Sequence, residues 1–415
     1  MKRIGLDRLI LAALVVALLI VLNLRLYRAP YAGVGALDAE GLAQLRFLDE
    51  AIASGAAQKM QRFYPEGFVF LQALYGLSWA ELARSPAASE ALREEALRKA
   101  RGALQEIESE QGRAVFSQKL DPPYGIFHSG WSAWLRGVIL HAAGPSIDSE
   151  EALLFTAQCD RIAAAFDRSP TPFLQSYVGS AWPSDSLIAV AALRLHDHLL
   201  TPRYEKTLTQ WTRSMRSRLD EETGLIPHAA YSPSRQERVR GSSQSLMLRF
   251  LVEIDPGLAA EHYRQYRTRF RTTWLGLPAM REYPVGIEGQ GDVDSGPVVF
   301  GIGAAATVVG LGTVRTFNDH ELATSLGQSM EFVGVPFSLS GRKRYIGGLL
   351  PIGDAFLVWS KLASPHVAPP QPSAHAPLLA WWCRLPMHAI SLCITALLSL
   401  WLRWASTRAE EAGAG

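Results

Sequence analysis

GQGDVDSGPVVFGIGAAATVVGLG, residues 289–312, shows in one segment the pattern on which this chain is built. Glycines surround Asp292, Asp294 and Ser295 in its first third, and a run of small and apolar residues follows Pro297. Because serine is a preferred N-cap and proline suits the first turn, the pattern predicts a helix that begins here and is buried all round. The carboxylate of Asp294 would lie at the positive end of that helix, either as a cap or as part of a site.

The same order, a polar or glycine-rich entry followed by an apolar helix, occurs six times along the chain. The six segments begin at Pro65, Phe127, Ala181, Arg240, Asp292 and Leu349. Their landmark residues are about 52 to 63 positions apart, a spacing that suits one helical hairpin with its loops. Charged, amphipathic stretches between them predict outer helices at residues 90–111, 149–168, 203–219, 256–273 and 320–332. The predicted fold class is all-α, with inner helices alternating with outer ones.

This alternation is the plan of an (α/α)6 toroid, and over residues 42–363 the chain resembles the six-hairpin glycosidase-like superfamily. Two local features add to the resemblance: the Asp-Ser or Gly-Asp entry of successive inner helices, and the segment 220–225, DEETGL, which is similar to the D-x-x-T-G-L loop of several such enzymes. The resemblance implies a carbohydrate-processing hydrolase. The chain also resembles linalool dehydratase-isomerase, which has a related fold and would imply a lyase or isomerase.

Length and composition allow one large domain. A chain of 415 residues with 48% hydrophobic content can bury a single core, and a toroid of six hairpins would use about 320 residues. A formal net charge of +2, without a basic run that contains aromatic residues, argues against binding to nucleic acid. The sequence lacks H-E-x-x-H, paired Cys/His spacing, a phosphate-binding loop and a dinucleotide fingerprint. We therefore expect no metal ion and no cofactor.

Two apolar segments predict membrane helices. Residues 9–21 are wholly apolar, basic residues precede them, and no small-x-small cleavage site follows closely, so residues 1–28 are predicted to be an uncleaved signal-anchor. Residues 386–402 have tryptophans on both sides, as in interface belts, so residues 381–415 predict a transmembrane or interfacial helix with a tail. Residues 364–380 are rich in proline and predict a stiff linker between this helix and the main domain, residues 29–363.

The charges and cysteines bear on the compartment. More basic residues precede the first apolar segment than follow it, and two follow the second, which predicts both tails in the cytoplasm and the main domain outside it, in the periplasm. The three cysteines, Cys159, Cys383 and Cys393, imply no disulfide framework. Cys159 is interpreted as a packed residue of an outer helix rather than a nucleophile, because no base is indicated near it.

In such a toroid all six inner helices begin on one face, so their N–H groups and entry loops converge there. That geometry suits an anionic or hydroxyl-rich ligand. Glycosidic cleavage needs one protonated and one ionised carboxyl, and Asp185 and Asp294, which open the third and fifth hairpins, are the predicted catalytic pair. Asp292 is the alternative to Asp294. His128 and His228 are the other candidate catalytic residues.

Sugar binding needs flat apolar faces and polar groups for the hydroxyls. The predicted binding residues are Tyr124, Trp131, Trp182, Tyr231, Arg240, Glu282, Tyr283, Glu66 and Asp354. Structural alternatives stay open, since an aspartate at a helix start is often only an N-cap, worth about 1 kcal/mol, and an inner-helix tryptophan often belongs to the core. The sequence predicts a protein that processes a polysaccharide, an oligosaccharide or another small hydroxylated substrate. A lyase or isomerase, or a non-catalytic glycan-binding scaffold, are the alternatives, and no protein partner is indicated.

Overall fold

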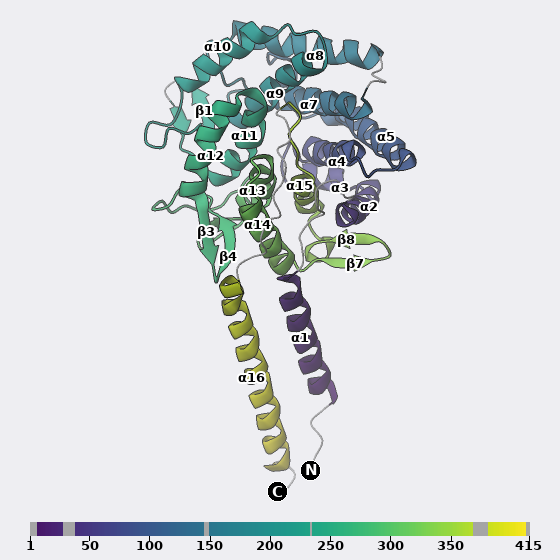
Figure 1. Cartoon of the computed structure of the whole chain (residues 1–415), viewed down its shortest axis with the longest axis vertical. Helices are drawn as coiled ribbons and strands as arrows, with labels where there is room; N and C mark the ends of the chain where they lie inside the picture. The colour runs from purple at the N-terminus through teal and green to yellow at the C-terminus, as the bar shows by residue number, and fades with distance from the viewer. Residues whose placement is uncertain (1–5, 28–37, 145–148, 233–234, 368–380, 412–415) are drawn as a thin grey trace.

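The computed structural model describes residues 6–27, 38–144, 149–232, 235–367 and 381–411, which form a predominantly helical body from which two long helices extend (Figure 1). The predicted helical class is confirmed. Of the predicted linker, residues 368–380 lie outside the described residues, as do residues 1–5, 28 and 412–415 of the predicted terminal segments and residues 29–37 of the predicted main domain.

Six helices form the inner part of the body, and we call them the helix ring. They are α4 (Gly67–Arg84), α7 (Gly125–Ala143), α9 (Pro183–Leu199), α11 (Gly241–Ile254), α13 (Ala304–Thr316) and α15 (Pro351–Lys361). α4 packs against α7, α7 against α9, α9 against α11, α11 against α13, and α13 against α15, which packs against α4 again. All six coincide with the predicted inner helices except that α13 begins later than expected.

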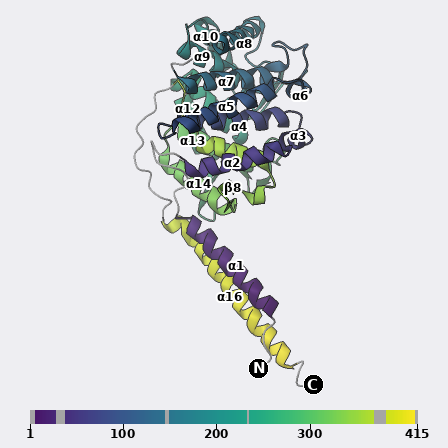
Figure 2. The ribbon, with the colours of Figure 1, turned by 90° about the vertical axis from the view of Figure 1, so that its right-hand side faces the viewer.

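A second set of helices covers the ring from outside. They are α2 (Ala39–Ala53), α5 (Glu90–Ile107), α8 (Ser149–Arg168), α10 (Glu205–Arg216), α12 (Pro256–Phe270) and α14 (His320–Val333), with the short α3 (Ala56–Gln61) and α6 (Glu110–Arg113) between them. α5 packs on α4 and α7, α8 on α7 and α9, α12 on α11, α14 on α13, and α2 on α15 and α4. The five predicted outer helices are all present. Figure 2 shows α2, α4, α5 and α7 running across the long axis of the molecule.

Capping and periodicity explain where an outer helix such as α5 begins and which face it buries. The hydroxyl of Ser89 accepts a hydrogen bond from the N–H of Leu92 at 3.3 Å, which satisfies one of the free donors of the first turn. Buried residues then recur every three or four positions, at Ala96, Ala100 and Ala103, while the charged residues between them face outward. Small alanines on the inner face let α5 lie close to α4.

The helix predicted to begin near Ser295 begins instead at Ala304. The residues between Ser295 and Ala304 include a hairpin of two short strands, β5 (Val298–Val299) and β6 (Ile302–Gly303). The Ser295 hydroxyl accepts from the N–H of Asp292 at 2.9 Å, so it closes a local turn and caps no helix. The helix prediction was wrong here because the β-branched valines and the glycines of this run favour a strand and a tight turn over a helix.

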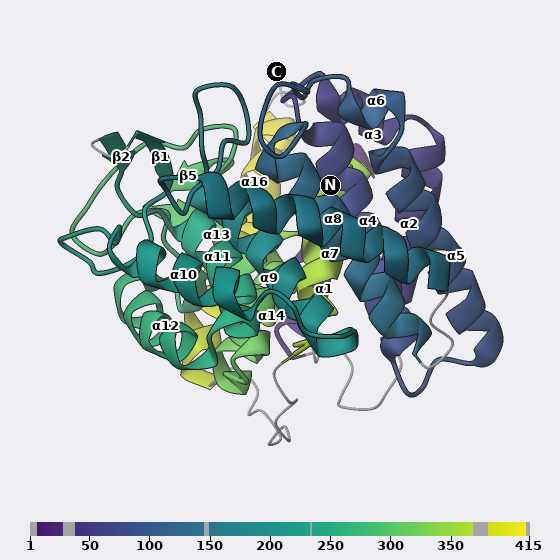
Figure 3. The same ribbon diagram turned by 90° about the horizontal axis from the view of Figure 1, so that it is seen from above.

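Three further antiparallel hairpins are present, and the all-helical prediction did not include them. They are β1 (Ala229–Ser232) with β2 (Arg235–Glu237), β3 (Arg271–Trp274) with β4 (Leu277–Met280), and β7 (Phe337–Leu339) with β8 (Arg342–Arg344), which the 3-10 helix η1 (Ile346–Gly348) follows. Each pair stands alone as a two-stranded sheet, so the hairpins decorate the helical body. Figure 3 shows β1, β2 and β5 on the same side of the body.

Aromatic side chains fill the centre of the helix ring. Trp131 of α7 contacts Phe70 of α4, Phe250 of α11 and Trp359 of α15, with ring centroids 5.1, 5.9 and 6.1 Å apart. Each such side chain stabilises the fold by about 1.5–3 kcal/mol through its burial. α13 and α15 lie close together because Gly312 has no side chain. A Cβ there would lie 3.1 Å from the Cα of Ser360 on α15. The interior is therefore a packed core and not a channel.

Residues 364–367, which follow α15, close one end of the ring, and we call this end the floor. Ser364 and His366 donate to the carboxylate of Glu81 near the end of α4, at 2.9 and 2.8 Å. The backbone N–H groups of His366 and Val367 donate to Glu253 near the end of α11. The first residues of the predicted linker thus belong to the body and tie the C-terminal ends of ring helices together.

The two extended helices are α1 (Leu6–Arg25) and α16 (Trp381–Glu411). They lie side by side in both views and contact each other, with Asn23 donating to Ser391 at 2.8 Å (Figures 1 and 2). Both are long and apolar enough to cross a membrane. Their ends away from the body lie together, so the N- and C-terminal tails lie on the same side of any membrane that both helices cross.

Candidate functional site

Three acidic residues from distant parts of the sequence lie near one another where ring helices begin. Glu66 stands at the N-cap position of α4, Asp185 in the first turn of α9, and Asp294 in the loop before β5. Tyr177 donates its hydroxyl to Glu66 at 2.6 Å, and Ser176 donates to Asp185 at 2.5 Å. We call Glu66, Tyr177, Asp185 and Asp294 the rim cluster.

The surroundings of the rim cluster bring the pKa values of two of its acids close to neutral pH. Burial raises the pKa of Asp185 to about 7, and the charges of Glu66 and Asp294 add to this rise against the opposing hydrogen bond from Ser176. Asp294 is exposed to solvent on one side. Desolvation by the surrounding protein, together with the charges of Glu66 and Asp292, nevertheless raises its pKa to about 6. Carboxyl groups with such pKa values can exchange protons with a substrate at physiological pH.

Beside these acids lies a group built on a buried arginine, and we call it the arginine cluster: His228, Arg240, Glu282 and Asp292. Arg240, the N-cap residue of α11, binds Glu282 through Nε at 2.8 Å and Asp292 through Nη1. Partial burial would raise the pKa of Asp292, but the hydrogen bonds from Arg240 and from the N–H of Ser295 outweigh it and lower the pKa to about 2. Asp292 is therefore ionised and paired, in contrast to Asp294.

Histidine 228 is held neutral within this cluster. Its Nδ1 is hydrogen-bonded to the hydroxyl of Ser243, and its Nε2 lies 3.4 Å from Nη1 of Arg240. Burial and the charge of Arg240 lower the pKa of His228 to about 4. At pH 7 His228 therefore carries a single ring proton and no charge, which leaves one ring nitrogen as a hydrogen-bond acceptor.

The fully buried Glu282 fixes the arginine. Its carboxylate accepts from Arg240, from the Ser242 hydroxyl at 2.6 Å and from the Ser242 N–H at 3.2 Å. Burial raises the pKa of Glu282 against these hydrogen bonds. Arg240 itself is buried, and its Nη2 has no hydrogen-bond partner among the described residues. That nitrogen is itself buried, so the polar contacts of Arg240 within the protein are those to Glu282, Asp292 and His228.

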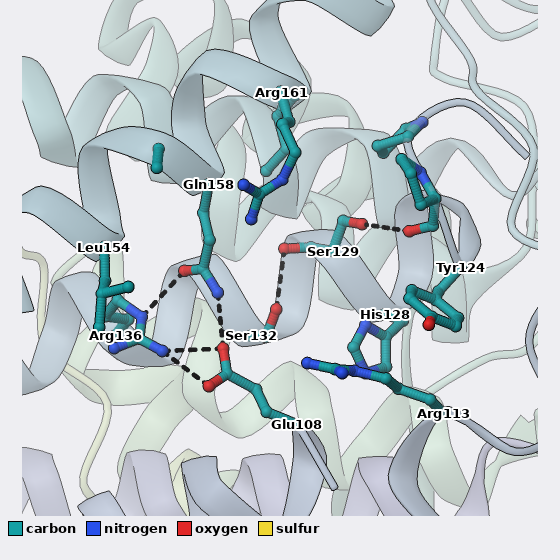
Figure 4. A pocket seen from close by; sticks show the side chains of 14 residues that line it. Glu108, Arg113, Tyr124, His128, Ser129, Ser132, Arg136, Leu154, Gln158 and Arg161 are labelled. Carbon is teal, nitrogen blue, oxygen red and sulfur yellow. Dashed lines mark hydrogen bonds and ion pairs between the residues drawn. The ribbon is translucent and has the colours of Figure 1, made fainter. Parts of the chain in front are cut away.

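His128 and Tyr124 face a different space. They line a cavity of about 370 Å³ between α7, α8 and the chain that precedes α7, together with Glu108, Arg113 and Arg161 (Figure 4). Nε2 of His128 is hydrogen-bonded to the carbonyl oxygen of Ile107 at 3.0 Å, and burial lowers its pKa. The cavity lining includes none of the residues of the rim or arginine clusters. His128 and Tyr124 thus line a separate cavity, and the ring of Phe116, whose centroid is 5.5 Å from those of both His128 and Tyr177, stands between His128 and the rim cluster.

Other predicted binding residues have structural surroundings. Trp131 is fully buried in the aromatic centre of the ring and has no face open to a sugar. Asp354 is buried on α15, accepts from the N–H of Tyr345 and from Gln44, and has a pKa raised by burial to about 7. Its hydrogen bonds attach α15 to the segment before it and to α2. The structure gives both residues a packing role, since a helix start and an aromatic residue serve packing as readily as chemistry.

The remaining predicted residues lie in the loops near the two clusters. The ring of Trp182 is half-buried and packs edge-on against Tyr177 at 5.8 Å. The Tyr283 ring lies 5.6 Å from the Arg240 guanidinium, and its hydroxyl donates to the carbonyl oxygen of Gln290. Tyr231 donates to Glu237 on the paired strand at 2.8 Å.

The sequence did not single out Tyr177, Tyr64 or Ser176. Tyr177 bonds Glu66, and burial raises its pKa, with the charge of Glu66 adding to the rise. Burial and the charges of Glu66 and Asp294 likewise raise the pKa of Tyr64. Each of these residues lies in a short loop that leads to a ring helix, close to a predicted acid. A tyrosine in such an entry loop was the available signal.

Among the described residues, no group of three or more His, Cys, Asp or Glu side chains is arranged to hold a metal ion. The carboxylates of Glu66 and Asp185 are hydrogen-bonded to hydroxyl groups instead. No protein-family model and no curated protein matches this chain. The function has to be argued from the geometry of the two clusters.

Proposed function

We propose that this protein is a membrane-tethered (α/α)6 toroid that cleaves or otherwise processes a polysaccharide or oligosaccharide with a pair of carboxyl groups. The closed series of contacts among the six ring helices, each covered by outer helices, supports the toroid assignment. It is also the architecture that the six-hairpin glycosidase-like superfamily uses. The observation that carries the catalytic proposal is the rim cluster, where three acids from separate loops influence one another.

The two raised pKa values suit different roles. Asp185, with a pKa of about 7, keeps its proton for part of the population at neutral pH and serves as the general acid. Asp294, with a pKa of about 6 and an exposed surface, is mostly ionised and serves as the base or nucleophile. The charge of Glu66 acts on both acids and helps to raise their pKa values above those of ordinary carboxylates.

Binding would use the polar and aromatic groups around the pair. Tyr64, Tyr177 and Trp182 are all partly exposed and present flat rings beside the acids, as a sugar ring requires. The positive charge of Arg240 acts on Asp294 and would favour a hydroxyl or an anionic group of the substrate beside it. Asp292 and Glu282 hold that guanidinium in place.

The terminal helices support a membrane location. If α1 and α16 both cross a bilayer, their adjacent free ends place both tails on one side and the body on the other. The excess of basic residues before α1 favours the cytoplasm for the tails and the periplasm for the body. A substrate at the cell surface or in the envelope would then be within reach.

The test uses the full chain in lipid nanodiscs and a panel of 4-nitrophenyl glycosides and end-labelled oligosaccharides. Asp294→Asn and Asp185→Asn should each reduce cleavage by roughly 10²- to 10⁴-fold, the usual contribution of general acid or base catalysis. Asp354→Asn is the matched control, because Asp354 is also a buried aspartate with a raised pKa but lies apart from the rim cluster. It should leave cleavage within about twofold, since it removes no group of the proposed catalytic pair.

Wild-type protein that binds the labelled oligosaccharides without cleaving any of them would favour a glycan-binding scaffold over a hydrolase. Equal loss of cleavage in all three variants would show that the effect comes from the fold. The resemblance to linalool dehydratase-isomerase would imply a cysteine near the site, and none of the three cysteines is part of the rim cluster or the arginine cluster. Cys159 is buried between α8 and α9, and Cys383 and Cys393 belong to α16.

A further inference from the structure

Two hairpin turns carry large apolar residues in positions where polar ones are usual. In the β3–β4 turn, Leu275 has φ 49° and Gly276 has φ 81°; in the β5–β6 turn, Phe300 has φ 52° and Gly301 has φ 76°. Such two-residue turns need positive φ at both positions, which favours Asn-Gly or Asp-Gly. A bulky side chain at positive φ is uncommon. An apolar side chain here has a reason beyond forming the turn.

The two turns lie against each other and are open to solvent. Trp274 stacks on Phe300 with ring centroids 5.8 Å apart, and 74% of Phe300 is exposed. Leu275, Trp274 and Val299 are exposed as well. We call Trp274, Leu275, Val299 and Phe300 the paired hairpin tips.

A third hairpin of the same geometry provides an internal contrast. The β7–β8 turn has Ser340 at φ 51° and Gly341 at φ 75°, so it repeats the backbone of the other two turns. Its first residue is polar, as the geometry ordinarily selects. The apolar residues in the paired hairpin tips are thus not a consequence of the turn type.

The paired hairpin tips stand where α16 leaves the body. A Cβ on Gly276 would lie 2.2 Å from the carbonyl oxygen of Cys383, so the β3–β4 turn touches the first turn of α16. Leu277 packs with Cys383, Met387 and Leu26 in a small apolar cluster that joins β4 to both terminal helices. In Figure 1 the β3–β4 hairpin points toward the start of α16.

The same level carries the residue types of a membrane interface. Trp381 and Trp382 are exposed at the start of α16, and tryptophan concentrates at the boundary between headgroups and acyl chains. Arg25 and Arg384 stand at the body ends of α1 and α16. The guanidinium of Arg384 lies over the ring of Tyr27 at 4.3 Å, and Arg25 donates to the carbonyl oxygen of Pro336. Both arginines therefore hold the terminal helices and the body together at this level.

We propose that the paired hairpin tips insert into the outer edge of the bilayer beside α16 and hold the body at a fixed orientation on the membrane surface. The bilayer is the occupant that fits, because the exposed apolar tips continue the surface of two helices that can cross it. This inference rests on the proposal that α1 and α16 span the membrane. It adds a third point of attachment, which stops the body from swinging on its two tethers.

Spin labels in phosphatidylcholine and phosphatidylglycerol nanodiscs test this insertion. The native Cys393, exposed on α16, is labelled as the depth reference. Phe300→Cys and Ser340→Cys are labelled separately in a Cys383→Ser, Cys393→Ser background, in which the buried Cys159 remains. Oxygen concentrates in the bilayer and a nickel chelate in water. The ratio of oxygen to nickel accessibility at position 300 should exceed that at position 340 several-fold and approach that at Cys393.

A second variant separates insertion from folding. Leu275→Asn with Phe300→Asn restores the turn residues that the geometry favours, so both hairpins should form at least as well. In nanodiscs with brominated lipids, quenching of Trp274 should be strong in the parent chain and lost in this double variant. The Trp274 signal is isolated by subtracting the matching Trp274→Phe protein.

Each outcome bears on the proposal. A label at position 300 that is as accessible to nickel as the label at position 340, while Cys393 lies deep, would overturn the insertion and leave the membrane-spanning helices intact. A water-exposed label at Cys393 would remove the spanning helices and the insertion with them. Neither result affects cleavage by the rim cluster, so the proposed activity stands or falls separately.

Discussion

The two ends of the helix ring both hold buried ionisable groups, but they treat carboxylates in opposite ways. At the floor, burial would raise the pKa of Glu81, yet the charges of His366 and Arg84 outweigh it and lower the pKa to about 2. At the rim, Asp185 has only hydroxyl partners and acidic neighbours, and its pKa rises to about 7. Burial alone therefore does not determine the role of a carboxyl group. The charge of its nearest partners decides whether a buried acid stabilises the fold or is ready to exchange a proton.

The floor shows what a stabilising arrangement looks like. The guanidinium of Arg249 lies over the ring of Trp359 at 3.3 Å and donates to the carbonyl oxygen of the same residue. Burial lowers the pKa of Arg249 to about 9, against the charges of Glu81 and Glu253. Cations and anions alternate across this end of the ring. The rim has no such alternation at Asp185, where the neighbouring charges are negative.

The largest effect is expected from breaking the floor. Glu81→Gln leaves the buried Arg249 and His366 and the half-buried Arg84 short of a counter-charge, and loss of one partner of a buried ion pair costs about 3–5 kcal/mol. The melting temperature of the full chain in nanodiscs, followed by near-UV circular dichroism, should fall accordingly at pH 7. Glu110→Gln on the exposed α6 is the control and should change stability by no more than about 0.5 kcal/mol.

The pH dependence gives a second reading of the same substitution. Because the folded pKa of Glu81 lies below its unfolded value of about 4.3, its ionisation contributes stability that is fully present above that value. This stability is lost as the pH falls toward 2, the folded pKa. The difference between Glu81→Gln and the parent chain should therefore shrink below pH 4. A difference that is constant with pH would contradict the ion-pair explanation.

A smaller effect of opposite sign is expected at the rim. The folded pKa of Asp185 lies above its unfolded value of about 3.9, so the stability that this group contributes is fully present below that value and is lost as the pH rises through 7. Asp185→Asn removes this penalty and keeps an acceptor for Ser176. The variant should be more stable than its parent by about 2–4 kcal/mol at pH 8 and equal to it at pH 4. A lower melting temperature at pH 8 would sink the assignment.

The smallest effect sharpens the contrast by changing a neighbour. Glu66→Gln removes a negative charge that raises the pKa of Asp185, so that pKa should fall. In a double-mutant cycle, the gain from Asp185→Asn at pH 8 should shrink by about 1 kcal/mol in the Glu66→Gln background. Glu288→Gln, which changes an exposed acid, serves as the control background. An unchanged gain would mean that the two acids do not interact.

The sequence determined the helical framework. Apolar runs with polar entries mark α4, α7, α9, α11 and α15, and charged amphipathic stretches mark the outer helices, because periodic burial is a local property that the residues themselves carry. The two apolar terminal segments, the second with its flanking tryptophans, likewise predicted α1 and α16. The candidate acids Asp185, Asp294 and Glu66 were visible for the same reason, as polar residues that precede apolar helices.

Tertiary structure decided what those residues do. It fixed 298–303 as a hairpin, since pairing between the strands and the bridge of Ile302 to Arg281 reinforced the strand preference of the valines. It brought Tyr177 to Glu66, which is 111 residues away along the chain. It also placed residues 364–367 against Glu81 at the floor, the end of the ring opposite the rim cluster. Asp294 and Asp354 look alike in sequence, yet only the first meets other acids. Proton affinity depends on neighbours in space, and no local pattern along the chain specifies those neighbours.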